Sequence, residues 1–299
     1  MFKVWKSNNE GPIILSDKEK QKKIRELRKM IQIADLDVRL DDIYMTRWLN
    51  CRDWNVDAAF KRVTKFYNFK RDNPDWYMSK DISHYEPLLQ RKICVMLDGR
   101  DRRGRRVYLI RAGHMNPDEI SLQDMATLHY MWLESIADEP ETIENGMAVL
   151  LDMKNTSWKL CKWFSPSNSK LSGKFTGLTP LKNFVVHMVN CSTACTTLMG
   201  MLSPFFSAEL RSKFCLHFKD LSLLHKCLGK EVLPEEYGGN QKLDFDKLIQ
   251  KLYKSKKIIE NGNILREKTK NERNAEINKE NAKKCSDRKS NQQIIAALD

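Results

Sequence analysis

The sequence lacks any apolar run long enough to cross a membrane. None of its 299 residues belongs to a stretch that approaches about 18 uninterrupted apolar residues. The first residues, MFKVWKSNNE, also lack the basic start, apolar stretch and small-residue cleavage site of a secretory signal. We therefore expect a soluble, intracellular protein that stays in the cytoplasm.

Catalytic and metal-binding motifs are missing as well. The 6 histidines show no HExxH spacing, no serine lies in a GxSxG turn, and the 8 cysteines form no Cys-x-x-Cys pair. In a reducing cytosol such cysteines act as small apolar residues. The sequence DRRGRR at 101–106 has a lone glycine and no nucleotide-binding loop, so a hairpin is favoured over a phosphate site. We therefore predict that the protein is not an enzyme and that it has no metal site and no cofactor.

Positive charge is in excess, and it is unevenly distributed. The net charge of +13 comes from 52 Lys/Arg against 39 Asp/Glu, and residues 241–299 hold 15 basic residues against 9 acidic ones. Apolar periodicity ends after LDFDKLIQKLY, so residues 262–292 are expected to be an exposed helix or disordered. The charge is either an ordinary solvated surface or an attraction for anionic lipid headgroups. Nucleic acid is not an expected partner, because no binding motif accompanies the charge.

Three sections follow one another without an internal repeat. Residues 1–78 read as a helical N-terminal domain, with a helix near 17–34 and others starting at Asp41 or Asp42 and at Asp57. Residues 79–245 alternate strands with helices, including one helix near 120–138, and residues 246–299 form a helical and partly disordered basic tail. The apolar strands RVYLI, MAVLLDM, FVVHMVN and FCLHF predict a covered, largely parallel sheet.

Residues 184–240 are the most informative part of the chain, and the apolar segment TTLMGMLSPFFSAELRSKF at 196–214 lies in the middle of them. At helical spacing its apolar residues cover more than the single stripe that a surface helix needs. Pro204 lies inside it and should end or kink the helix. We predict a lid over an apolar cavity, carried by Met199, Met201, Leu202, Phe205 and Phe206.

Five stretches carry a family resemblance: residues 41–77, 98–113, 144–158, 179–190 and 232–240. In their order and separations they resemble the CRAL-TRIO family of intracellular lipid-transfer proteins, and within it the tocopherol and retinaldehyde carriers. The resemblance implies an α/β fold: a mixed, largely parallel sheet with helices and a mobile lid helix, after a small all-helical domain.

The resemblance also implies a set of residues that line a lipid pocket. These residues are His129, Leu133, Met147, Leu151, Leu171, Phe175, Val186, Cys195 and Leu198. Nearly all are apolar, as a chain of methylenes requires, since each buried methylene contributes about 0.8 kcal/mol. An ordinary core role is the alternative, above all for Met147, Leu151 and Val186. His129 either donates a hydrogen bond to a ligand hydroxyl or carbonyl or is satisfied by backbone or water.

A basic patch that senses phosphoinositides is a further feature implied by the resemblance. Its candidates here are Lys61, Lys182, Arg211 and Lys213. The pattern departs from the family at Phe184 and Glu209, where positive charge is absent. Ordinary solubilising charges are the alternative.

The resemblance implies a monomeric carrier that binds a small hydrophobic lipid, a tocopherol, retinoid or similar molecule, and transfers it between membranes that it meets transiently. Two alternatives stay open. One is a phosphatidylinositol or phospholipid exchange protein, although no convincing set of polar partners for a charged headgroup is evident. The other is a lipid-responsive scaffold without transfer activity, which the basic tail would serve.

Overall fold

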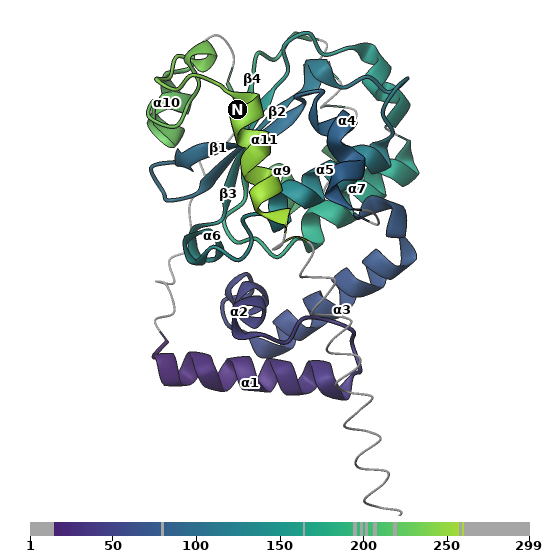
Figure 1. Cartoon of the computed structure of the whole chain (residues 1–299), viewed down its shortest axis with the longest axis vertical. Helices are drawn as coiled ribbons and strands as arrows, with labels where there is room; N and C mark the ends of the chain where they lie inside the picture. The colour runs from purple at the N-terminus through teal and green to yellow at the C-terminus, as the bar shows by residue number, and fades with distance from the viewer. Residues whose placement is uncertain are drawn as a thin grey trace, which may run out of the picture.

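The structure is a computed structural model that describes residues 15–78, 81–163, 165–193, 196–197, 200, 203–205, 208–217, 220–256 and 259. Three N-terminal helices lie on one side of a larger α/β part, which is built around a single sheet (Figure 1). This arrangement confirms the expected fold class.

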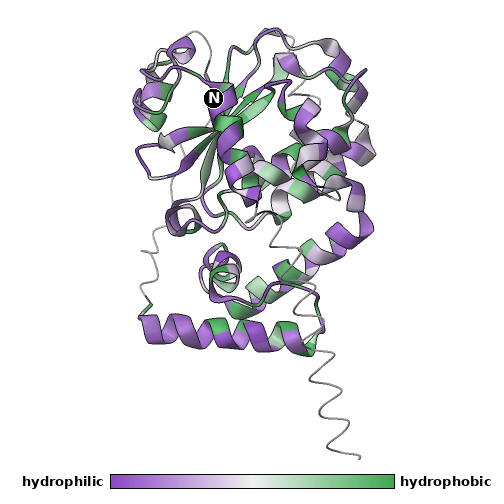
Figure 2. Ribbon diagram, in the orientation of Figure 1, coloured by the Kyte–Doolittle hydropathy of each residue, from purple (hydrophilic) through white to green (hydrophobic). Residues whose placement is uncertain are grey.

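The N-terminal helices are α1 (Asp17–Ile33), α2 (Asp42–Asn50) and α3 (Val56–Asp72). The starts of α1 and α2 agree with the predicted ones, and α3 begins one residue before the predicted Asp57. Each start has a side-chain cap, because Ser16, Asp41 and Asn55 accept hydrogen bonds from backbone N–H groups of the first turn. The polar face of α1 is turned to solvent (Figure 2), and its apolar stripe packs on α2 and α3.

The sheet contains the strands β1 (Cys94–Arg100), β2 (Arg106–Arg111), β3 (Met147–Asp152), β4 (Val185–Val189) and β5 (Phe214–Leu216), in that spatial order. β1 is antiparallel to β2, and each later pair is parallel. The first strand begins at Cys94, ahead of the expected strand pair at 98–113, because the apolar residues before Asp98 are buried. The 101–106 turn is the predicted hairpin, and Gly104 has a φ of +73° there.

Helices and 3-10 turns connect the strands. They are η1 (Pro74–Trp76), η2 (Ile82–Tyr85), α4 (Glu86–Leu89), η3 (Ala112–His114), α5 (Leu122–Glu134), α6 (Pro140–Asn145), η4 (Trp158–Trp163), α7 (Pro166–Leu178), η5 (Ser203–Phe205), α9 (Ala208–Arg211), α10 (Ser222–Leu228), η6 (Glu235–Tyr237) and α11 (Phe245–Lys254). The helix predicted near 120–138 is shorter than expected, because Ser121 and Asp124 form a capping box at its start and the helix ends at Glu134.

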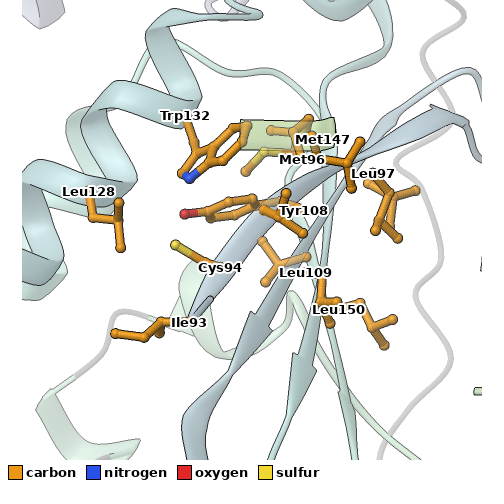
Figure 3. Close-up of a cluster of buried hydrophobic side chains, with 14 of the residues drawn as sticks. Ile93, Cys94, Met96, Leu97, Tyr108, Leu109, Leu128, Trp132, Met147 and Leu150 are labelled. Carbon is orange, nitrogen blue, oxygen red and sulfur yellow. The ribbon is translucent and has the colours of Figure 1, made fainter. Parts of the chain in front are cut away.

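The two faces of the sheet bury different helices. Tyr108 is in register with Val149, and Val149 with Val186, so these three side chains share one face. Figure 3 shows Tyr108 and Cys94 on the side of Leu128 and Trp132 of α5, with Leu97 and Leu150 on the opposite side.

The opposite face is covered by α11. Its residues Phe245, Leu248, Ile249 and Leu252, the helical pattern read from the sequence, are buried in the same cluster as the sheet. Leu248 lies at a surface hollow that Leu97 also lines. The first helix of the section predicted as a tail therefore packs on the sheet.

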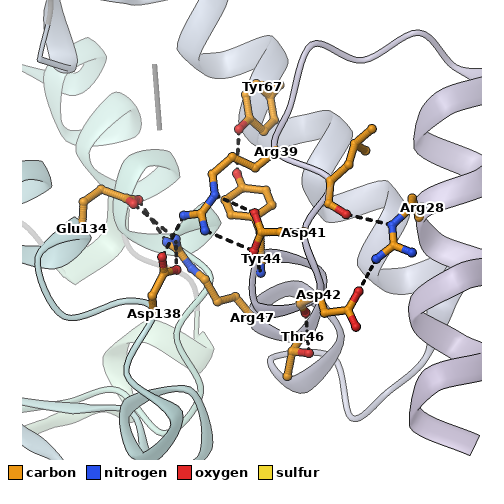
Figure 4. A network of polar contacts seen from close by, with 11 residues as sticks. Arg28, Arg39, Asp41, Asp42, Tyr44, Thr46, Arg47, Tyr67, Glu134 and Asp138 are labelled. Carbon is orange, nitrogen blue, oxygen red and sulfur yellow. Dashed lines mark hydrogen bonds and ion pairs between the residues drawn. The ribbon is translucent and has the colours of Figure 1, made fainter. Parts of the chain in front are cut away.

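A buried ion-pair network joins the N-terminal helices to the α/β part (Figure 4). Arg47 of α2 is 3% exposed, and its Nη2 lies 3.0 Å from Glu134 Oε1 of α5. Its Nη1 lies 3.2 Å from Asp138, which also pairs with Arg39 at 2.9 Å. Burial alone would raise the pKa of Glu134, but the charge and hydrogen bonds of Arg47 hold it below its ordinary value. The junction is thus fixed by charge as well as by packing.

Candidate functional site

A histidine of α5 meets a tyrosine of the sheet on the face that α5 covers. The Tyr108 hydroxyl lies 2.8 Å from Nδ1 of His129, and the rings meet edge to face. Tyr108 is fully buried, whereas His129 is half-buried. Burial lowers the pKa of His129 to about 4, so the imidazole is neutral at physiological pH. The predicted site residue His129 thus has a specific partner that sequence reasoning missed.

Other predicted pocket residues lie on the same face of the sheet. Met147 and Val186 are buried in the main core cluster, and Leu151 is half-buried against it. Leu151 and Ile110 are paired across β2 and β3 near the strand ends, and both remain partly exposed. This face therefore carries apolar surface at the carboxyl ends of the strands that the described residues do not fully cover.

Two predicted pocket residues of α7 belong instead to the core of the N-terminal helices. Phe175 is buried against Trp76 and Tyr77, with ring centroids 5.8 and 5.6 Å apart, and Leu171 packs against the same cluster. The structure thus separates Leu171 and Phe175 from Met147, Leu151 and Val186 on the sheet. Their role toward a ligand stays a prediction.

A small cavity lies at the junction between the helical part and the sheet domain. Leu133 and Phe175 line it, together with Arg47 and Tyr77. The Arg47 Nε and the Tyr77 hydroxyl are buried without a hydrogen-bond partner among the described residues. Two unpaired polar atoms at one cavity suit a bound water molecule. No pattern in the sequence could have indicated this cavity, because its walls come from five separate stretches of the chain.

Most of the predicted lid lies outside the described residues. This holds for Cys195, Leu198, Met199, Met201, Leu202 and Phe206. Pro204 and Phe205 lie in the 3-10 turn η5, whose backbone runs beside α7. The lid assignment therefore stays a prediction.

The predicted basic residues lie near the amino ends of β4 and β5. Lys182 precedes β4 and pairs with Asp53 at 2.9 Å, and the carbonyl of Lys213 accepts a hydrogen bond from the Val186 N–H. Lys61 is exposed on α3, next to Arg62, which donates to the Thr179 carbonyl near Lys182. Arg211 ends α9 and donates to the Ser203 carbonyl at 3.0 Å. Whether these side chains form one basic patch stays a prediction.

Two histidines contact each other on the other face of the sheet. Nδ1 of His187 is 2.9 Å from Nε2 of His217, and both rings are buried and stacked. Burial and the neighbouring His217 ring lower the pKa of His187 to about 3. The pair is separated from His129 by the sheet, so it forms no part of the candidate site.

Two features of other functional classes are missing from the described part of the chain. No group of three or more His, Cys, Asp or Glu side chains in it is placed to hold a metal ion. None of its helices combines the length and the apolar composition that a membrane crossing needs.

Solved structures and curated proteins place these features among known proteins. The crystal structure of Sfh5 superposes with a TM-score of 0.53 at 17% identity, covering 79% of this chain and 92% of that one, which shows a shared fold. The human "Alpha-tocopherol transfer protein-like" is 27% identical over 219 residues, covering 72% of this chain and 64% of the relative. Mouse "Clavesin-1" is 29% identical over 241 residues, covering 77% of this chain and 65% of the relative.

The aligned part of the chain thus spans less than two thirds of the length of these curated relatives. The domain match is more direct. Residues 90–239, which run from before β1 to just after η6, match the CRAL/TRIO domain. With its mixed sheet, covering helices and half of its length in the domain, the chain belongs to the CRAL/TRIO domain family.

Proposed function

We propose that this protein binds one small hydrophobic lipid against the α5 face of its sheet and transfers it between membranes. The observation that carries the proposal is the incompletely covered apolar surface on that face. Ile110, Leu151, Phe214 and Leu216 face the same side of the sheet as Tyr108 and are each half-buried. Membership of the CRAL/TRIO domain family and the name of the tocopherol transfer-like relative support it.

The transfer cycle that we propose uses the apolar face of residues 194–206 as a lid. Its opening would expose apolar residues that dock on a bilayer in the manner of an interfacial helix. Closing it would shield the lipid, because each methylene removed from water contributes about 0.8 kcal/mol. Submicromolar binding then needs only a modest number of buried carbons.

Native mass spectrometry of the purified protein, followed by organic extraction, tests the proposal. A stoichiometric isoprenoid, retinoid or similar neutral lipid would support the carrier. A phospholipid would favour the exchange alternative instead. A protein that is reproducibly empty and that takes up no lipid from liposomes would contradict lipid binding and favour the scaffold.

A charge on the proposed pocket floor should abolish lipid uptake. Leu151→Asp places a carboxylate on the half-buried apolar surface, where burying it under a lipid is costly. We expect at least a tenfold loss of lipid uptake from liposomes, with the cooperative unfolding transition retained. The matched control is Leu223→Asp, because Leu223 is 54% exposed on α10. Equal uptake by the two variants would contradict a pocket at Leu151.

We further propose that Lys61, Lys182 and Lys213 attract anionic phosphoinositide headgroups and so couple membrane contact to lipid release. Each well-placed lysine contributes about 1 kcal/mol near an anionic membrane. Replacing all three by glutamine should reduce lipid release to phosphoinositide-containing liposomes by about tenfold or more, while release to neutral liposomes stays the same. The control replaces Lys18, Lys22 and Lys29, exposed residues of α1, by glutamine. Unchanged stimulation in the first variant would remove the proposal.

A further inference from the structure

Few contacts hold the β5 edge of the sheet. β5 contains three residues and is the last strand in the spatial order, so in the described sheet it pairs with β4 alone. The Val186 N–H donates to the Lys213 carbonyl, and the His217 N–H donates to the Met188 carbonyl, each at 2.8 Å. The bond between the His187 and His217 side chains adds a link across this edge. Because a short edge strand opens more readily than the centre of a sheet, this side-chain bond carries a large share of its stability.

The two rings share a single hydrogen. Nδ1 of His187 and Nε2 of His217 face each other at 2.9 Å, so one of these atoms donates and the other accepts. Both rings are 2% exposed, and Nε2 of His187 is buried without a hydrogen-bond partner among the described residues. When both rings are protonated, both facing nitrogens carry hydrogen. The bond is then lost, and two buried cations face each other.

The hairpin between β1 and β2 adds positive charge to these surroundings. Among the residues that the structure describes, the charged groups that act on His187 are both positive: Arg105 and Arg103. The hairpin also contains the buried carboxylate of Asp101, which lies 2.6 Å from the Arg105 guanidinium. Asp101 accepts further hydrogen bonds from the backbone N–H groups of Arg103 and Arg105. This carboxylate is therefore already compensated and does not attract a proton to the histidines.

The neighbouring strands and α10 supply no negative charge to the pair. His187 is in register with Leu150 of β3 and with Cys215 of β5. Burial raises the pKa of the Cys215 thiol, and Cys227 of α10 lies near enough to raise it further. The thiol of Cys215 is therefore protonated and uncharged at physiological pH. A proton added to the histidine pair thus meets burial and positive charge.

The closed edge consequently binds protons less readily than an open one. Burial and the neighbouring His217 ring lower the pKa of His187 to about 3, and burial also lowers the pKa of His217. A histidine in an open, hydrated edge titrates near its ordinary pKa of about 6.5. As the pH falls below that value, the open edge takes up protons that the closed edge does not. The closed form therefore loses stability with falling pH.

The same strand carries part of the proposed lipid surface on its other face. Side chains alternate along a strand, so Cys215 shares the face of His187, whereas Phe214 and Leu216 face the side of α5. Phe214 and Leu216 are both half-buried. Separating β5 from β4 would move these two apolar side chains away from the rest of the surface on which we propose that the lipid binds.

We infer that the His187–His217 pair makes the β5 edge sensitive to acid: protonation of the pair separates β5 from β4 and speeds the release of a lipid bound on the α5 face. The lipid part of this inference rests on the proposed function, whereas the response of the edge does not. An anionic membrane attracts protons as it attracts other cations, so its surface supplies the acidic condition. An edge that is open in a small fraction of molecules changes the rate of release more than the affinity.

Amide hydrogen exchange at two pH values measures the opening without any lipid. The Val186 and His217 N–H groups report on the β5 edge, and the Arg111 N–H, which donates to the Ile93 carbonyl, reports on the far side of the sheet. Each rate is divided by the intrinsic exchange rate at the same pH. Between about pH 7.5 and 5.5 the opening constant of the edge should rise about tenfold for each histidine that takes up a proton. The value for Arg111 should stay nearly constant, and an edge constant that is equally independent of pH would overturn the inference.

A variant without titratable groups at the edge carries His187→Asn and His217→Gln together. The asparagine amide lies near the position of Nδ1 and the glutamine amide near that of Nε2, so a polar contact remains. We expect the same opening constant at both pH values. The matched control is His84→Gln, because His84 is exposed on η2, and it should keep the wild-type response. A double variant that still opens on acidification would overturn the role of the pair.

The wild-type protein alone decides the matter where the double variant does not fold. Nitrogen–proton spectra of the imidazole rings follow the protonation of His187 and His217 in the folded state. Both rings should remain neutral when the pH is lowered through 6.5. Titration of both rings near pH 6.5 without any opening of the edge would overturn the inference.

The lipid part is tested with tocopherol, followed by its fluorescence as it leaves the protein for phosphatidylcholine vesicles, which carry no net charge. Release from the wild-type protein should be about tenfold faster or more at pH 5.5 than at pH 7.5, and release from the double variant should be the same at both. An edge that opens in acid without faster release would overturn the link to the lipid. Protein that binds no tocopherol and carries no lipid after purification would overturn the proposed function, while hydrogen exchange still tests the edge.

Discussion

Replacing Arg47 by methionine is expected to lower the free energy of unfolding by about 3–5 kcal/mol. Arg47 is 3% exposed and is the cation at the centre of the junction network. Its loss leaves the Glu134 carboxylate, which is only 20% exposed, without its partner at 3.0 Å. Among the residues that the structure describes, Asp138 would keep Arg39 as its ion-pair partner. Urea denaturation followed by tryptophan fluorescence measures the loss.

Two further variants show whether the loss comes from an uncompensated charge. The double replacement Arg47→Met with Glu134→Met removes both charges, and we expect it to be more stable than Arg47→Met alone. Arg71→Met breaks an exposed pair with Asp72, so it should change stability by less than about 0.5 kcal/mol. A double variant that is no more stable than Arg47→Met would show that packing, not charge, dominates at this position.

The junction network also bears on the candidate site, because α5 carries both. Glu134 lies five residues after His129 on that helix. Through Glu134, Arg47 holds the end of α5 against the N-terminal helices. A variant that loosens the junction should therefore weaken lipid uptake from liposomes as well as stability.

Local sequence signals were enough to predict most of the elements. Caps act within one turn, so the starts of α1 and α2 could be predicted from Ser16 and Asp41. The spacing of Phe245, Leu248 and Leu252 predicted α11 for the same reason. The hairpin before β2 followed from its turn residues.

Those local signals do not predict contacts between segments that are far apart in the sequence. Arg47 and Glu134 are 87 residues apart, and neither residue marks the other in a single sequence. Phe175 was predicted to line a pocket, and apolarity alone does not distinguish that from packing against Trp76. His129 was recognised as unusual, but its hydrogen-bond partner, Tyr108, lies 21 residues earlier in the sequence. The candidate site thus needed tertiary geometry, whereas the fold largely did not.

Replacing Gly146 by alanine is expected to destabilise the protein by about 3 kcal/mol or more. Gly146 has a φ of +80°, which strains any residue with a Cβ, and the added methyl would overlap the Lys182 carbonyl at the entry to β4. Gly177→Ala is the matched control, because no atom lies within 4 Å of its Cβ position in α7, and we expect it to stabilise by roughly 0.5–1 kcal/mol. Urea denaturation compares the two. A Gly146→Ala variant within about 1 kcal/mol of wild type would show that the segment before β4 can move aside, and Lys182 would then be a poorly fixed contact for a headgroup.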